Sequence, residues 1–213
     1  MSRGESKFIA ILLAGIIVFS CILIYKIKSE PKYDQQLYDE IYSEYEELLG
    51  TIENKEANNT EEKVKDNTIH MIANSQGQKY RVAGEISIPK ININYPIVYE
   101  TTEEYLKIAP TKLFGPDINE VGNLCIAGHN YKNKQLFGGI KELDINDKVY
   151  LTANNGERFT YLVYDKYEVN ENDLSCTSQE TNGNIEVTLI TCTTTKKNRL
   201  VVKCRNSSIL NLT

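Results

Sequence analysis

The chain has 213 residues, with 24 Lys and Arg against 29 Asp and Glu, and a formal net charge of −5. This length allows one domain of ordinary size with additional segments. Because there is no basic stripe, nucleic acid is not expected as a partner. The cysteines and histidines lack the spacing of a zinc site, so we expect neither a bound zinc ion nor another cofactor.

Residues 8–25 form an uncharged run rich in Ile and Leu. As a helix, this run would span roughly 27 Å, close to the bilayer core of about 30 Å. A cleaved signal peptide is the alternative, but its apolar core would be only about 7–15 residues long, and residues 24–28 do not resemble a cleavage site. We therefore expect a transmembrane anchor over 8–25 after a short N-terminus over 1–7. Basic residues are nearly balanced on its two sides, so charge alone does not orient it.

The segment after the anchor, residues 26–79, is predicted to be a linker. Apolar residues at helical spacing over 33–50, with Gly50 as a stop, predict an amphipathic helix. Its apolar stripe could pack on the following domain, or the helix could be a solvated spacer. Residues 53–78 are polar and bury too little apolar surface to offset the entropy of ordering, which predicts a flexible connection.

From Tyr80 onward, short apolar runs alternate with clusters of Gly, Pro, Asn and Asp. The predicted strands cover 82–88, 91–98, 123–127, 148–152, 158–169, 185–191 and 199–203. Asn154-Asn155-Gly156 predicts a hairpin turn between two of them. Short helices are expected over 101–108 and 135–143. This pattern predicts a mostly-β domain over 80–205, a small closed barrel or a sandwich, followed by a tail over 206–213.

Three residues near predicted strand ends carry reactive groups. A threonine-rich apolar run ends on Cys192, Arg199 follows seven residues later, and another apolar run closes on His129. Cysteine can act as a nucleophile, histidine can move a proton, and arginine can stabilise negative charge on a carbonyl oxygen. The second histidine, His70, lies in a polar stretch. In the alternatives, Cys192 is a buried small hydrophobe or Arg205 takes the arginine role.

Side chains alternate between the two faces of a strand. On each of the three predicted strands, the reactive residue lies on the face opposite the fully apolar one. The alternation pairs each reactive group with a small or branched apolar neighbour: Ala127 with His129, Ile190 with Cys192, and Val201 with Arg199. The opposite faces are apolar: Leu124 and Ile126, Val187 and Leu189, and Leu200 and Val202. We expect a shallow apolar groove with three reactive groups along it, although alternation alone does not bring the strands together.

These residues resemble the motifs of the sortases, which are membrane-anchored cysteine transpeptidases of Gram-positive bacteria. Thr188-Leu189-Ile190-Thr191-Cys192 resembles the signature around the nucleophile, and Gly128-His129-Asn130 resembles the histidine segment. Arg199-Leu200-Val201-Val202 resembles the arginine strand. The order and spacing of the motifs and the N-terminal anchor agree with the family, and the resemblance covers roughly residues 80–205.

The resemblance implies a closed eight-stranded β-barrel. It also implies a cell-membrane protein that crosses the membrane once, with the N-terminus in the cytoplasm and the catalytic domain outside. Cys192 would be the nucleophile, His129 the acid and base, and Arg199 the group that stabilises the oxyanion or positions the substrate. The implied substrate-binding residues are Ala127, Ile190, Thr191 and Val201.

The implied reaction cuts a C-terminal sorting signal, commonly Leu-Pro-x-Thr-Gly, after its threonine and holds the surface protein as a thioester. An amine of a cell-wall cross-bridge precursor, or a pilin lysine, then takes the acyl group. A free thiol with a pKa near about 8.5 is mostly protonated at neutral pH, so it needs a cationic neighbour such as His129 or Arg199. Two alternatives stay open: a membrane-tethered cysteine endopeptidase that releases the acyl group to water, and a non-catalytic membrane-anchored binding module.

Several features of the sequence bear on subclass and ligands. No long insert separates Lys166 from Ile185, no Asp-Pro-aromatic lid or second apolar span accompanies the predicted barrel, and Thr193 rather than Asp follows the cysteine. A housekeeping or specialised single-substrate sortase is expected. Some members bind calcium, for which oxygens could come from Glu100, Glu103, Glu104, Glu171 and Asp173. The sequence does not pair Cys125, Cys176 and Cys204, which could equally be packed or surface thiols.

Overall fold

The computed structural model describes residues 35–58, 70–73, 77–195 and 197–207. The chain divides into one unit over 1–32 and a second over 33–213, and all described residues belong to the second. The predicted N-terminus over 1–7 and anchor over 8–25 lie outside the described residues. Within the described part, no helix has the length and apolar character needed to cross a membrane.

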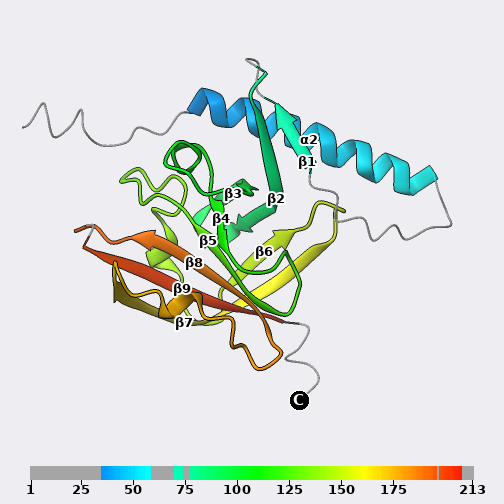
Figure 1. Cartoon of the computed structure of the whole chain (residues 1–213). Coiled ribbons are helices and arrows are strands. Elements are labelled where there is room, and N and C mark those ends of the chain that lie inside the picture. The colour runs from blue at the N-terminus through cyan, green and yellow to red at the C-terminus, as the bar shows by residue number, and fades with distance from the viewer. Residues whose placement is uncertain (1–34, 59–69, 74–76, 196, 208–213) are drawn as a thin grey trace, which may run out of the picture. The chain divides into compact units, whose positions relative to one another are not determined.

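Eight strands form a closed barrel (Figure 1). The strands are β2 (Lys79–Ile88), β3 (Ile93–Val98), β4 (Thr111–Phe114), β5 (Gly122–Ala127), β6 (Lys148–Thr152), β7 (Arg158–Asn170), β8 (Ile185–Cys192) and β9 (Asn198–Asn206). Their order is β2-β3-β4-β5-β8-β9-β7-β6, and β6 pairs with β2 to close the ring. A ninth strand, β1 (His70–Ala73), pairs with the first half of β2. The predicted closed barrel is confirmed, and each predicted strand overlaps an observed one.

The interior of the barrel is filled by the residues that strand alternation assigned to it. Leu124 and Ile126 of β5 and Val187 and Leu189 of β8 are buried in one apolar cluster, together with Val202 of β9. Each fully buried branched side chain of this kind contributes about 1.5–3 kcal/mol relative to exposure. The core therefore holds the three strands that carry the motifs with their other faces turned outward.

Helix α2 (Gln35–Asn58) overlaps the helix expected over 33–50 and continues past Gly50. Ile41 and Tyr45 are buried in a second apolar cluster that includes Tyr80 and Val82 of β2. Of the two alternatives, the structure therefore shows the docked helix rather than the solvated spacer. In Figure 1 the helix passes across β1 and β2, and it contacts β1 and β3.

The helices expected over 101–108 and 135–143 are wrong in length. Each region contains only a single 3₁₀ turn, η2 (Tyr105–Lys107) and η3 (Ile140–Glu142). At the start of the second region, Leu136 has a φ angle of 49° and the preceding Lys134 one of 65°, both in the left-handed region that an α-helix excludes. The apolar side chains of this region instead belong to an irregular segment that reaches into the core.

The β6–β7 hairpin turns where the sequence predicts. Gly156 has a φ of 81°, which favours glycine, and its N–H donates to the carbonyl of Ala153 at 2.9 Å. The N–H of Ala153 donates in turn to the carbonyl of Glu157 at 2.9 Å. The turn therefore matches a hairpin loop that ends on a left-handed glycine.

Candidate active site

The three motif strands are neighbours in the barrel wall (Figure 1). β5 runs parallel to β8, with Ala127 level with Ile190, and β8 runs antiparallel to β9, with Ile190 opposite Val201. Ala127, Ile190 and Val201 therefore form one row across the three strands. Two residues further along β8 lies Cys192, so the next row on this side contains the reactive residues.

The strand pairing itself places Cys192 beside Arg199, because these two residues are directly opposite in the β8–β9 ladder. The N–H of Thr193 donates to the carbonyl of Asn198 at 3.0 Å, which makes the adjacent pair the non-hydrogen-bonded kind. In such pairs the Cα atoms are about 4.5 Å apart and the side chains are close. The thiol and the guanidinium therefore start from neighbouring backbone positions.

The guanidinium of Arg199 lies near a carboxylate oxygen and a backbone carbonyl oxygen. Its Nη2 lies 3.6 Å from Oε2 of Glu171, and its Nη1 donates to the carbonyl of Asn198 at 3.4 Å. Arg205, the alternative for the arginine role, lies opposite Glu186 on β8 and donates to its Oε1 from Nη2 at 2.8 Å. Arg205 therefore belongs to a different ion-pair network, six residues along β9.

His129 is brought to the level of Cys192 by three hydrogen bonds between its segment and β8. The N–H of Gly128 donates to the carbonyl of Ile190 at 3.1 Å, and the hydroxyl of Thr191 donates to the carbonyl of Gly128 at 2.6 Å. The side-chain amide of Asn130 donates to the carbonyl of Cys192 at 2.6 Å. These bonds continue the β5–β8 contact beyond the end of β5, on both sides of the histidine.

The imidazole of His129 packs against an aromatic side chain. The ring of Tyr131 lies edge-to-face with it, at a centroid distance of 5.5 Å and an interplanar angle of 63°. Burial raises the pKa of Tyr131 to about 12, so this phenol stays neutral near pH 7. Tyr131 therefore adds ring contact to the histidine but no charge.

Cys192 is the partly exposed thiol of the described cysteines, all of which are free. Cys125, Cys176 and Cys204 are buried, and burial raises the pKa of all three thiols, to about 12 for Cys125. A raised thiol pKa disfavours the thiolate, which is the reactive form. The burial of the other three therefore leaves Cys192 as the thiol that can meet a reactant.

The comparison with protein families agrees with this arrangement. The model of the sortase domain matches residues 86–207. The chain belongs to the sortase family. It is 34% identical over 128 residues to sortase A of Bacillus anthracis, a match that covers 60% of this chain and 60% of that protein.

Among solved structures, the sortase is similar to sortase A of Listeria monocytogenes, with a TM-score of 0.53 and 27% identity, over 59% of this chain and 87% of that one. A sortase D5 transpeptidase of Clostridium perfringens gives a TM-score of 0.59 at 24% identity, over 77% of this chain and 98% of that one. The second likeness shows the shared fold alone. The aligned region spans 60% of the length of the Bacillus anthracis relative.

Two of the residues expected to bind substrate in this sortase are placed differently. Thr191 faces away from Cys192, is only 3% exposed and uses its hydroxyl on Gly128, so it tethers a neighbouring strand instead of facing a groove. Val201 is fully buried, in a cluster with Cys125 and Cys176. Neither side chain presents appreciable surface in this structure, and the contact of each with substrate stays a prediction.

The covering over Val201 is the segment that connects β7 to β8, residues 171–184, which includes η4 (Ser175–Thr177). The side-chain amide of Asn123 holds this segment by donating to the carbonyls of Cys176, at 2.9 Å, and Ser178, at 3.1 Å. Ile190 is 7% exposed, whereas Ala127 is partly exposed. The open part of the row is therefore its Ala127 end.

The acidic residues considered for calcium are engaged separately. Glu100 pairs with Arg81 at 2.7 Å, Glu171 lies near Arg199, and Asp173 accepts a hydrogen bond from the N–H of Ser175 at 2.9 Å. Within the described part of the chain, no group of three or more His, Cys, Asp or Glu side chains is placed to hold a metal ion. The acidic side chains named as possible calcium ligands therefore form no such group among the described residues.

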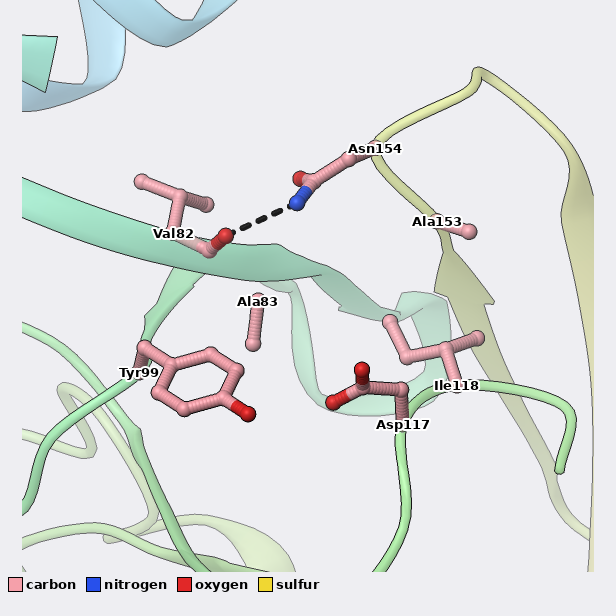
Figure 2. Close-up of a pocket in the computed structure, with 7 residues that line it drawn as sticks. All are labelled: Val82, Ala83, Tyr99, Asp117, Ile118, Ala153 and Asn154. Carbon is pink, nitrogen blue, oxygen red and sulfur yellow. Dashed lines mark hydrogen bonds between the residues drawn. The ribbon is translucent and has the colours of Figure 1, made fainter. Parts of the chain in front are cut away.

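A small pocket lies elsewhere on the barrel (Figure 2). It is lined by Val82, Ala83, Tyr99, Asp117, Ile118, Ala153 and Asn154. The amide of Asn154, from the β6–β7 hairpin, donates to the carbonyl of Val82 at 2.8 Å and closes one side, as Figure 2 shows. None of the three reactive residues lines this pocket.

Proposed function

We propose that this sortase is a cysteine transpeptidase that anchors surface proteins. It cleaves a C-terminal Leu-Pro-x-Thr-Gly-like sorting signal, holds the protein as a thioester on Cys192, and transfers it to an amine of the cell wall or to a pilin lysine. The observation that carries the proposal is the row of reactive residues. Cys192 faces Arg199 across the β8–β9 ladder, and His129 is tied to β8 on both sides.

In the first step, the thiol of Cys192 gives its proton to His129, and the sulfur attacks the threonyl carbonyl carbon of the signal. The carbonyl oxygen gains negative charge, and the guanidinium of Arg199, one strand away, stabilises that charge. When the C–N bond breaks, the imidazolium of His129 gives its proton to the leaving amine. The products are a thioester on Cys192 and a free C-terminal peptide.

In the second step, an acceptor amine attacks the thioester carbonyl. His129, now neutral, takes the proton that the amine loses and passes it to the departing sulfur of Cys192, so the thiol is restored as the amide forms. Water in place of the amine would give the endopeptidase reaction with the same residues. The identity of the acceptor therefore separates the two enzyme functions.

Arg199 must leave Glu171 at least in part to reach a substrate oxygen. Their side chains are 31% and 49% exposed and 3.6 Å apart, and exposed ion pairs of this kind contribute only about 0–1 kcal/mol. The exchange of Glu171 for a substrate carbonyl therefore costs little. Of the proposed substrate-binding residues, Ala127, on the row below, is partly exposed, whereas Ile190 beside it is 7% exposed.

For location, we propose a single-pass membrane protein with its barrel outside the cell. The uncharged run over 8–25 supports an anchor, and membership of the sortase family supports the orientation. Protease treatment of intact protoplasts tests this placement. Digestion of the barrel from outside is expected, whereas complete protection would contradict it.

The test of the activity uses the full chain with a Leu-Pro-x-Thr-Gly peptide, with and without triglycine, followed by mass spectrometry. Transpeptidation predicts a product that carries triglycine and a trapped acyl group on Cys192, and both disappear in Cys192→Ala. Hydrolysed peptide alone would replace the proposal by the endopeptidase. Absence of turnover, with peptide binding retained in Cys192→Ala, would favour the binding module.

A further inference from the structure

The backbone of His129 is held by a segment that leaves β5 and folds back. Asn130 forms an isolated antiparallel bridge with Leu136, and the N–H of Phe137 donates to the carbonyl of His129 at 3.0 Å. Residues 136–137 are therefore a return leg that contacts the histidine backbone directly. A shift of this leg moves the residue that carries the imidazole.

The return leg adopts a conformation that its sequence does not favour. Leu136 has a φ of 49°, where an L-residue with a large side chain meets steric repulsion. Its side chain is fully buried in the barrel core, and its N–H donates to the hydroxyl of Tyr95 at 3.2 Å. These two contacts keep Leu136 in place against its local preference.

Tyr95 is itself held by helix α2. Its ring lies edge-to-face with the ring of Tyr38, at 5.0 Å between centroids and an interplanar angle of 66°. The hydroxyl of Tyr38 donates to the carbonyl of Asn94 at 2.8 Å. The helix also contacts the residue that precedes the return leg, because the amide of Gln135 donates to Oε1 of Gln35 at 2.9 Å.

We propose that Tyr95 is a positioning residue for His129. Its hydroxyl accepts the hydrogen bond that keeps Leu136 in the left-handed conformation. This conformation positions the return leg, whose Phe137 N–H in turn holds the carbonyl of His129. Helix α2 supports this chain of contacts by packing Tyr38 on the ring of Tyr95. The proposal rests on the proposed function, in which His129 transfers the proton.

The test is Tyr95→Phe in the full chain, which keeps the ring and removes the hydroxyl. The barrel offers a matched control in Tyr161→Phe. The N–H of Asn119 donates to the hydroxyl of Tyr161 at 3.2 Å, and Asn119 also has a left-handed φ, of 65°. Both variants therefore lose a tyrosine hydroxyl that caps a left-handed residue, but only Tyr95 is connected to the histidine segment.

The first measurement is amide hydrogen exchange, which does not depend on any reaction. Because a buried N–H loses its acceptor, Tyr95→Phe is expected to speed exchange at Leu136 and Phe137 by about tenfold, and Tyr161→Phe is expected to leave these amides unchanged. Unchanged exchange in Tyr95→Phe would overturn the proposal.

The second measurement is the kinetics of transfer. Tyr95→Phe is expected to lower kcat about tenfold with KM within about twofold, and Tyr161→Phe to keep both within about twofold. Faster exchange with unchanged kcat would also overturn the proposal. If the wild type transfers no peptide, the pH dependence of Cys192 alkylation replaces kcat: a shift in Tyr95→Phe but not in Tyr161→Phe supports the positioning role, and equal profiles overturn it.

Discussion

The hydroxyl of Thr191 holds the carbonyl of Gly128, the residue that precedes His129, with an oxygen–oxygen distance of 2.6 Å in a buried setting. Thr191→Val keeps the shape of the side chain and removes this donor. The N–H of Gly128 keeps its bond to the carbonyl of Ile190, so Gly128 stays attached to β8 through its other backbone group. The variant therefore loosens the histidine segment without detaching it from β8.

The expected magnitude follows from the group that is left behind. A buried acceptor without its donor costs about 1–3 kcal/mol, so the free energy of unfolding should fall by about that amount. The same loss lets the carbonyl of Gly128, and with it His129, move away from Cys192. A misplacement that raises the activation free energy by about 1.4 kcal/mol lowers kcat about tenfold.

Thr188→Val is the matched control for this prediction. The hydroxyl of Thr188 is also buried, also lies on β8, and donates to Oδ1 of Asn123 at 2.6 Å. Urea unfolding should show a similar loss of stability for both variants, whereas transfer of peptide to triglycine at saturating peptide should lose kcat only in Thr191→Val. Equal kcat in the two variants would refute the tether between Thr191 and the histidine segment.

Two further predictions concern stability and thiol reactivity. The side chain of Glu186 is 5% exposed and pairs with Arg205 and Lys203. Burial acts to raise the pKa of Glu186, but Arg205, Tyr164 and Lys203 together lower it, so its stabilising effect is complete above about pH 4.5 and is lost as pH falls through the lowered pKa. Urea unfolding of Glu186→Gln should show a loss of about 2 kcal/mol at pH 7 that shrinks in acid, and a constant difference would contradict this assignment. Iodoacetamide at pH 7 should alkylate Cys192 in the native protein and buried Cys204 only after unfolding, by peptide mapping, and early labelling of Cys204 would contradict its burial.

Strand alternation in the sequence predicted the barrel core well. Leu124, Leu189 and Val202 lie in the interior, as their spacing indicated. Once a strand is paired, its register fixes which face each side chain occupies. The adjacency of the Cys192 and Arg199 strands followed from the sortase resemblance and not from spacing alone.

Other features depend on contacts between distant parts of the chain, which periodicity does not show. β4 is only four residues long, and its exposed end, at Leu113 and Phe114, lacks the alternation of a half-buried strand. The helix expected over 135–143 is absent because Leu136 is held by Tyr95, 41 positions earlier. The covering of Val201 likewise comes from a loop whose position the strand pattern does not specify.

The tether from Asn130 was also missed as a functional contact. Its amide reaches the carbonyl of Cys192 across 62 positions of sequence. The available signal was its place directly after His129 in the matched histidine segment. A polar side chain directly after the histidine can form a hydrogen bond with the strand next to it. The sequence does not identify the partner atom, which depends on the register between the two strands in the folded structure.

The opposition of Cys192 and Arg199 has a consequence for engineering. Their separation is set by the β8–β9 rungs beneath them, and the closing rung is the bond from Thr193 to Asn198. The connection between Thr193 and Asn198 does not set this separation. It can therefore be lengthened or exchanged while the sulfur and the guanidinium keep their mutual distance.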